Sequence, residues 1–167
     1  MRPHLTTVCY HAQVRALGID YGGRRIGLAV SDPTGLLARP LSTLTRAPGE
    51  SDEAVARAIL RVIADLEREG EPIGAIVIGL PRRLDGSPNE QTPLVLAFAE
   101  RLRTLTTIPV ALQGERLTSR EAESRLALRE KDWRRRKAQL DAAAAAVMLQ
   151  DYLDARRTPG VPDSDAY

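Results

Sequence analysis

The spacing of apolar and polar positions divides the first part of the chain into three short strands. Val14–Tyr21 and Ile26–Val30 are apolar runs rich in β-branched residues, and Gly22-Gly23 separates them, which is typical of a β-hairpin. Leu36–Thr45 follows an Asp-Pro-Thr-Gly turn and predicts a third strand. We therefore expect a meander of three antiparallel strands at the start of the fold.

The rest of the chain alternates between helical and extended patterns. After Ser51, apolar residues recur every three or four positions until Gly70, which predicts an amphipathic helix. Ile73–Leu80 is a continuous apolar run, as expected for a parallel strand covered on both faces. The remaining predicted elements are a helix over Asn89–Leu105, a strand over Pro109–Gln113, a helix over Thr118–Leu128, a charged loop over Arg129–Arg136 and a helix over Ala138–Arg157. This order predicts an α/β fold with a five-stranded mixed sheet, three antiparallel strands and then two parallel ones, and helices on both faces.

Length and composition are those of a single globular domain. The chain has 167 residues, of which 43% are hydrophobic and 28% are charged. We expect a flexible N-terminal extension over residues 1–14, one domain over 15–157 and a disordered tail over 158–167. No apolar run approaches the roughly 18 residues of a membrane span, and the N-terminus lacks a signal-peptide pattern. One cysteine, Cys9, gives no disulfide framework, so a cytoplasmic protein is expected.

Positive charge is concentrated late in the chain. The net charge is only +2, yet residues 115–137 contain nine basic and five acidic residues. Arginine predominates among the basic ones, and its planar guanidinium matches phosphate oxygens well. This pattern favours a partner that carries phosphate, although a coding bias toward arginine would give the same composition.

Three acidic residues stand where ligands gather in such a fold, at the carboxyl ends of strands. Asp20 ends the first apolar run, Glu115 follows the predicted last strand, and Asp141 stands at the start of the alanine-rich helix. Each has a structural alternative: Asp20 shapes a turn, Glu115 is a solvated acid at a helix start, and Asp141 caps its helix or is a surface residue. Together they predict a site only if that helix crosses the ends of the strands.

Converging carboxylates repel one another unless a cation joins them. Mg²⁺ and Mn²⁺ prefer oxygen ligands. Two such ions, about 3.5–4 Å apart, activate water and stabilise the leaving oxygen of a phosphodiester. We therefore expect two Mg²⁺ or Mn²⁺ ions at these acids and a metal-dependent hydrolysis of phosphodiesters.

Four motifs in this order resemble the YqgF/RuvX family, the RuvC-like branch of the RNase H-like superfamily. They are IDYGGRRIGLAVSD, IVIGLPRRLDGS, ERLTSREAE and LDAAAAAVMLQDYL, and the resemblance runs from about Ala16 to Leu153. It implies an RNase H-like fold and a metal-dependent nuclease whose catalytic acids fall on Asp20, Glu115 and Asp141. The family usually has an acid just before the glutamate of its third motif, where this chain has Gly114.

Candidate contacts to nucleic acid surround these acids. One arginine of the first turn would pin an acid and the other would meet phosphate, and the pair after the central strand would clamp the backbone or form a solvated turn. Trp133 would stack on an unpaired base, or pack on its own domain or at a dimer interface. The candidate set is Arg24, Arg25, Arg82, Arg83, Arg116, Arg120, Trp133, Arg134, Arg135, Arg136 and Lys137.

Family members are described as processing the 5′ end of pre-16S rRNA and as Holliday junction resolvases. The resemblance therefore implies a nuclease in ribosome biogenesis, acting as a monomer or a homodimer, with junction cleavage in recombination as the alternative. A non-catalytic ribosome-assembly factor that binds nucleic acid is a second alternative. An ATPase or sugar kinase is disfavoured, because such enzymes carry two copies of this core and the chain has one.

Overall fold

The computed structural model of the chain describes residues 14–83, 85–115 and 133–157. The predicted helix over 118–128, most of the N-terminal extension and the predicted tail lie outside the described residues. The elements are β1 (Arg15–Tyr21), β2 (Arg25–Ser31), β3 (Ala38–Thr45), α1 (Asp52–Arg68), β4 (Ile73–Pro81), α2 (Thr92–Leu105), β5 (Val110–Glu115) and α4 (Trp133–Arg157).

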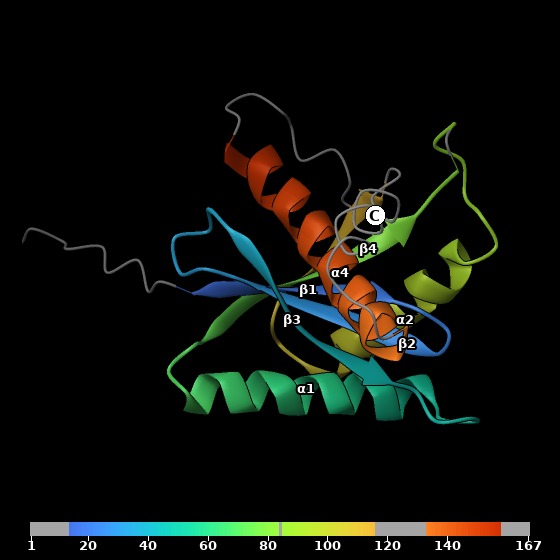
Figure 1. The fold of residues 1–167 in the computed structure, drawn as a ribbon, viewed down its shortest axis with the longest axis horizontal. Helices are drawn as coiled ribbons and strands as arrows, with labels where there is room; N and C mark the ends of the chain where they lie inside the picture. Colours follow the sequence, from blue (N-terminus) through green and yellow to red (C-terminus); the bar gives the residue numbers. More distant parts are fainter. Residues whose placement is uncertain (1–13, 84, 116–132, 158–167) are drawn as a thin grey trace, which may run out of the picture.

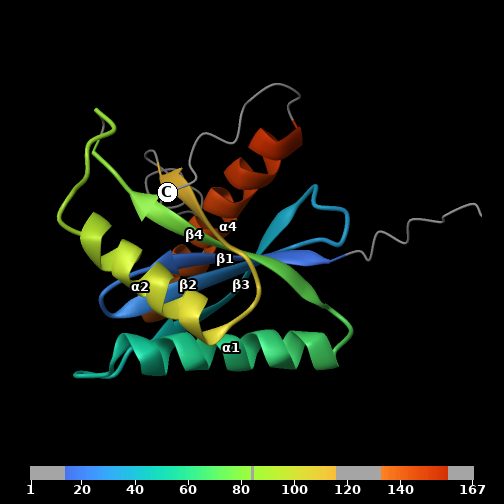
Figure 2. The same cartoon turned by 180° about the vertical axis from the view of Figure 1, so that it is seen from behind.

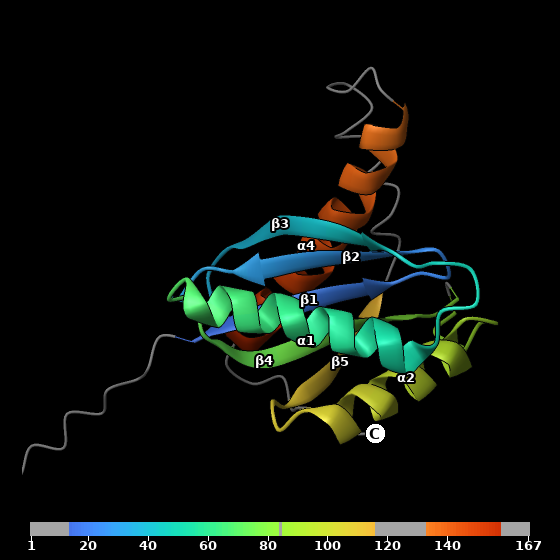
Figure 3. The same ribbon diagram turned by 90° about the horizontal axis from the view of Figure 1, so that it is seen from below.

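The five strands form one mixed sheet in the order β3-β2-β1-β4-β5. β2 is antiparallel to both β1 and β3, whereas β4 is parallel to β1 and to β5. In Figure 3 the arrows of β1 and β2 point in opposite directions. The predicted five-stranded architecture is confirmed. The carboxyl ends of β1, β3, β4 and β5 therefore meet at one border of the sheet, which we call the carboxyl edge.

Helices cover both faces of the sheet. α1 and α2 lie on one face and α4 crosses the other (Figures 1 and 2). Residues of β1 alternate between the two layers: Leu17 and Ile19 are fully buried in the core beneath α1 and α2, while Ala16 packs with α4. Within the described residues, no helix is long and apolar enough to cross a membrane.

Polar contacts fix α4 on the strands that it crosses. The side chain of Gln150 accepts a hydrogen bond from the backbone N–H of Ala38 at 2.8 Å and donates one to the carbonyl of Leu36 at 2.9 Å. Nearer the start of α4, the hydroxyl of Thr43 donates to the carbonyl of Ala138. The helix is thus tied to both ends of β3.

Several predicted boundaries are wrong: β3 begins at Ala38 rather than Leu36, and three others have a local reason. α4 begins at Trp133 rather than Ala138, because arginine and lysine form helices well and continue the helix into the predicted loop. α2 begins at Thr92 rather than Asn89, because the side chain of Asn89 accepts hydrogen bonds from the N–H groups of Gln91 and Thr92. β5 continues to Glu115, since its pairing with β4 continues that far.

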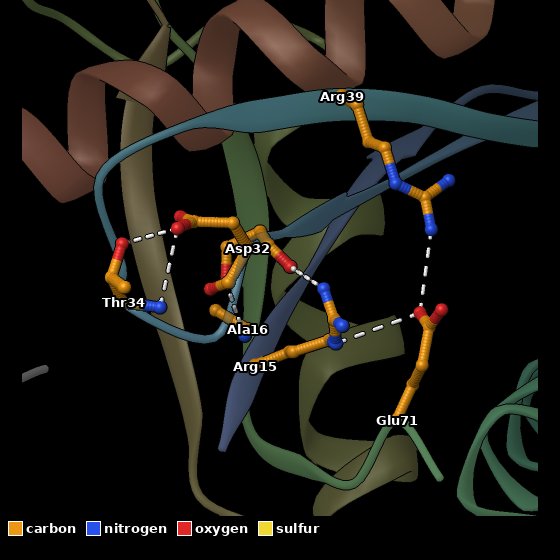
Figure 4. A network of polar contacts seen from close by, with 7 residues as sticks. Arg15, Ala16, Asp32, Thr34, Arg39 and Glu71 are labelled. Atoms are coloured by element: carbon orange, nitrogen blue, oxygen red, sulfur yellow. Dashed lines mark hydrogen bonds and ion pairs between the residues drawn. The ribbon is translucent and has the colours of Figure 1, made fainter. Parts of the chain in front are cut away.

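A network of charged residues lies at the border of the sheet opposite to the carboxyl edge (Figure 4). Glu71 pairs with Arg15 at 3.5 Å and with Arg39 at 3.3 Å, and Arg15 also donates to the carbonyl of Ser31. These ion pairs join the starts of β1, β3 and β4, so they hold strands together far from the predicted acids.

Asp32 organises the turn between β2 and β3. Its carboxylate accepts hydrogen bonds from the N–H groups of Leu36 and Leu37, at 2.8 and 2.9 Å, and from Thr34. The hydrogen bond from Leu37, followed by those from Thr34 and Leu36, holds the pKa of Asp32 far below its usual value of 3.8. The ionised carboxylate is therefore the form that stabilises this turn.

Replacing Asp32 by alanine is expected to lower the Tm at pH 7 and to have progressively less effect in acid. A depressed pKa contributes stability above the pKa of the unfolded state, near 3.8, and this contribution is lost as pH falls toward the pKa of the folded state. The check is thermal unfolding of both proteins between pH 7 and pH 2. A Tm difference that stays constant across this range would contradict the role assigned to the ionised carboxylate.

Candidate active site at the carboxyl edge

Asp20 is the penultimate residue of β1 and lies half-buried at the carboxyl edge. Because side chains alternate along a strand, it belongs to the face that α4 covers, whereas Ile19 and Tyr21 belong to the other core. In the antiparallel ladder Asp20 stands opposite Gly27 of β2. What lies over Gly27 therefore lies next to Asp20.

The residue over Gly27 is Asp141 of α4. A Cβ atom added to Gly27 would stand only 1.9 Å from the carbonyl oxygen of Asp141. Two turns further along α4, Leu149 makes the same close approach to Gly18 of β1, where an added Cβ would stand 2.9 Å from the Cβ of Leu149. Two glycines thus let α4 lie directly on the sheet, and they place Asp141 beside Asp20.

Arg25 compensates the charge of Asp141. The Nε atom of Arg25 lies 2.7 Å from Oδ2 of Asp141, and their side chains are 30% and 28% exposed. Both atoms are buried and have no hydrogen-bond partner, so the contact between them is an ion pair only. Of the two arginines in the first turn, Arg25 is thus the one that pins an acid, and Arg24 is exposed.

Glu115 ends β5 at the same edge, with its Cα in register with Pro81 of β4. Its side chain lies outside the described part of the structure. Among the described residues, no group of three acidic, histidine or cysteine side chains could hold a metal ion. The described site therefore comprises two of the three predicted acids, and the place of Glu115 in it stays a prediction.

A basic pocket opens beside Arg25, between the β1–β2 turn, the segment after β3 and the start of α4. It has a volume of about 790 Å³, and we call it the basic pocket. Its cationic lining residues are Arg24, Arg25, Arg46 and Lys137. Three of these four were candidates from the sequence, and their positive charges suit an anion such as a phosphate.

The structure describes only some of the other candidates for nucleic-acid binding. Arg82 and Arg83 follow β4 at the carboxyl edge, where the backbone N–H of Arg83 donates to the carbonyl of Ser87 and Arg83 is exposed. Arg135 is exposed in the first turn of α4. Arg116 and Arg120, and the side chains of Trp133, Arg134 and Arg136, lie outside the described part of the structure.

Arg46 is a residue of this edge that the sequence analysis missed. It follows β3 directly, and its backbone N–H donates to the carbonyl of Arg24 at 2.8 Å. The alternation of strand directions was the available signal, because the third strand of a meander ends at the same border as the first. A basic residue just after that strand therefore belonged among the candidates.

Gly114 stands where the family usually has an acid, and the structure leaves room there. Within the part of the chain that the structure describes, a Cβ atom added to Gly114 would meet no atom within 4 Å. We expect Gly114→Asp to fold with a free energy of unfolding within about 0.5 kcal/mol of wild type, as for substitutions in open space. Thermal unfolding of the two proteins checks this expectation, and a clear loss of Tm would show that Gly114 is required by the fold.

The chain is thus an α/β protein with a five-stranded mixed sheet, and its candidate active site lies at the carboxyl edge. The family model for RuvX, described as Holliday junction resolvase, matches residues 14–155. The chain therefore belongs to the RuvX family, as the motifs predicted.

Two relatives and one solved structure match most of the length of this chain. A protein of Anaeromyxobacter dehalogenans (strain 2CP-C) is 44% identical over 87% of this chain and 100% of its own length. One of Syntrophus aciditrophicus (strain SB) is 40% identical over 92% and 96%. Both carry the name "Putative pre-16S rRNA nuclease". The structure of T. thermophilus RuvC in complex with a Holliday junction substrate matches 86% of this chain and 95% of that one, at 23% identity and a TM-score of 0.49.

Proposed function

We propose that this protein is a divalent-metal-dependent nuclease that cleaves structured RNA and processes the 5′ end of pre-16S rRNA. The observation that carries this proposal is the placement of Asp141 over Gly27, the residue opposite Asp20 in the sheet, beside the basic pocket. Family membership and the names of the relatives support the same activity.

The donor set fits Mg²⁺ or Mn²⁺. Both acids offer carboxylate oxygens, which these ions prefer, and the Oδ2 of Asp141 is buried beside the Nε of Arg25, at 2.7 Å. Asp20 and Asp141, with Glu115 as the third ligand, would hold two ions. When bound, the ions would lower the pKa of a water and stabilise the leaving oxygen of the phosphodiester.

The surrounding residues position these groups and the substrate. Arg25 holds the Asp141 carboxylate at the edge through its 2.7 Å ion pair, as partners of metal ligands commonly do. Arg24 and Lys137 line the basic pocket, where they would bind backbone phosphates next to the scissile bond. Arg82 and Arg83, at the end of β4, would contact the sugar–phosphate backbone of the RNA on the other side of the acids.

Holliday junction cleavage is the second candidate, and the description of the family favours it. A resolvase cuts two strands symmetrically, so that activity would require a two-fold dimer. Processing of a ribosomal RNA end makes no such demand. The two functions thus differ in substrate and in the oligomeric state that they need.

A side-by-side assay tests the proposal. Purified protein is incubated with Mn²⁺ and either a pre-16S 5′ leader RNA or a four-way DNA junction of matched length. We expect cleavage of the leader to the mature 5′ end and little cleavage of the junction. Preferential, paired cuts in the junction would favour the resolvase, and salt-sensitive binding without any cleavage would favour the non-catalytic assembly factor.

A further inference from the structure

A second pocket lies on the other side of Arg46, beneath the carboxyl edge. Its volume is about 460 Å³, and it opens between the β1–β2 turn and the first turns of α1 and α2. The apolar walls are Tyr21, Leu94 and Val95, and the polar ones are Asp52 and Gln91. We call it the edge pocket. Its size is within the range of pockets that hold small ligands, about 300–1,000 Å³.

The edge pocket adjoins the basic pocket. Gly23 and Arg46 line both of them, so the two pockets are neighbours at the β1–β2 turn. Asp20, the predicted metal ligand, directly precedes Tyr21, whose ring belongs to the edge pocket. A chain whose phosphates occupy the basic pocket would therefore present its next nucleotide to the edge pocket.

The polar groups of the edge pocket are preorganised. Oδ1 of Asp52 accepts hydrogen bonds from the Tyr21 hydroxyl at 2.7 Å and from Nη2 of Arg46 at 2.5 Å. Nη1 of Arg46 donates to the Tyr21 hydroxyl at 2.7 Å, and its Nε donates to the carbonyl of Glu50. The Tyr21 ring is in turn stacked on Phe98, with ring centroids 4.4 Å apart. The pocket is thus held rigid from the core outward.

This chemistry matches one kind of ligand group. A guanidinium has five N–H donors, and the described bonds of Arg46 use three of them. The carboxylate of Asp52 is neutralised by Arg46 and, within the described residues, its Oδ2 receives no hydrogen bond. Apolar walls, a neutralised acceptor and an amide together suit a flat heterocycle that carries N–H donors and carbonyl or ring acceptors at its edge.

We propose that the edge pocket binds an unpaired nucleobase of the substrate strand, next to the phosphates that lie in the basic pocket. This inference rests on the proposed function, and it adds that the substrate is single-stranded on this side of the cut. Leu94 lines the pocket with 59% of its surface exposed, and a stacked base would cover it. Apolar and aromatic side chains that contact bases in this way bind them with little sequence preference.

Binding of two RNA hairpins by fluorescence anisotropy, in EDTA so that nothing is cleaved, tests the edge pocket. One hairpin carries a four-nucleotide 5′ extension, and the other carries the same extension with abasic residues, which keep the phosphates and lack the bases. We expect wild type to bind the first hairpin about tenfold more tightly. In the double variant Gln91→Ala/Leu94→Ala this preference should shrink to less than threefold, with unchanged affinity for the abasic hairpin.

Leu96→Ala is the matched control, because Leu96 is an exposed leucine of the same helix that does not line the pocket. It should keep the full preference for the extension with bases. Equal affinity of wild type for both hairpins, or an undiminished preference in the double variant, would overturn the base pocket while leaving the nuclease proposal intact. Absence of binding to either hairpin would overturn both proposals.

Discussion

Asp20→Asn is expected to lower metal-dependent cleavage by more than about a hundredfold, because even the loss of a group that only supports a metal ligand costs roughly 10–100-fold. The substitution keeps the size and shape of the side chain and removes the negative charge that would hold the ions. Asp20 stands at the carboxyl edge opposite Gly27, the residue over which α4 places Asp141. The measurement is the initial rate of leader RNA cleavage at saturating Mn²⁺.

Asp65→Asn provides the matched control for charge and chemistry. Asp65 lies on α1, with its side chain 59% exposed, and it pairs only with Arg68 among the described residues. It should cleave at the wild-type rate, and both variants should keep the wild-type Tm within a few degrees. Full cleavage activity of a folded Asp20→Asn protein would remove Asp20 from the site.

Gly27→Ala is expected to have the largest effect on stability, with a loss of about 3 kcal/mol, the upper end of the usual range for overpacking. The new methyl group would overlap the backbone of Asp141, at 1.9 Å from the carbonyl oxygen and 2.3 Å from the carbonyl carbon. Backbone atoms of a helix cannot rotate away, so α4 as a whole must move. For a domain of this size the Tm should fall by about 10 °C.

The same displacement should carry Asp141 away from Asp20, so cleavage should also fall at temperatures where the variant is folded. Gly23→Ala is the control for stability, since a Cβ at Gly23 would meet no atom of the described residues within 4 Å. Urea unfolding of both variants measures their free energies of unfolding, which should fall for Gly27→Ala and stay near wild type for Gly23→Ala. A Gly27→Ala protein as stable as wild type would contradict the close packing of α4 on β2.

Most strands and helices could be predicted because each is specified by the spacing of apolar residues within its own segment. The apolar runs predicted as strands are β1, β2 and β4 of the sheet core, and α1 follows Ser51 as predicted. The Ser51 hydroxyl caps this helix by accepting a hydrogen bond from the N–H of Ala54. The start of α4 was predicted too late because the charged segment Arg129–Arg136 was interpreted as a loop, although arginine is a good helix former. The end of β5 is set by its pairing with β4, and this pairing cannot be predicted from the residues of β5 alone.

The sequence was enough to propose candidate residues for the site, but not to predict how α4 packs beside them. Asp20 and Asp141 could be selected because an acid beside an apolar run or an alanine-rich helix is unusual. The approach of Asp141 to the strand residue opposite Asp20 depends on Gly27, whose lack of a side chain lets α4 lie close, and this long-range packing has no local signature. Arg46 and the edge pocket escaped for the same reason, since their partners come from β1, α1 and α2.

Anomalous X-ray diffraction from crystals soaked in Mn²⁺ tests the central claim most directly, because it locates the ions without reference to activity. We predict strong anomalous peaks bounded by the carboxylates of Asp20 and Asp141, absent in crystals of Asp20→Asn. Peaks elsewhere on the protein, with none between these two acids, would contradict the assignment of the carboxyl edge as the metal centre.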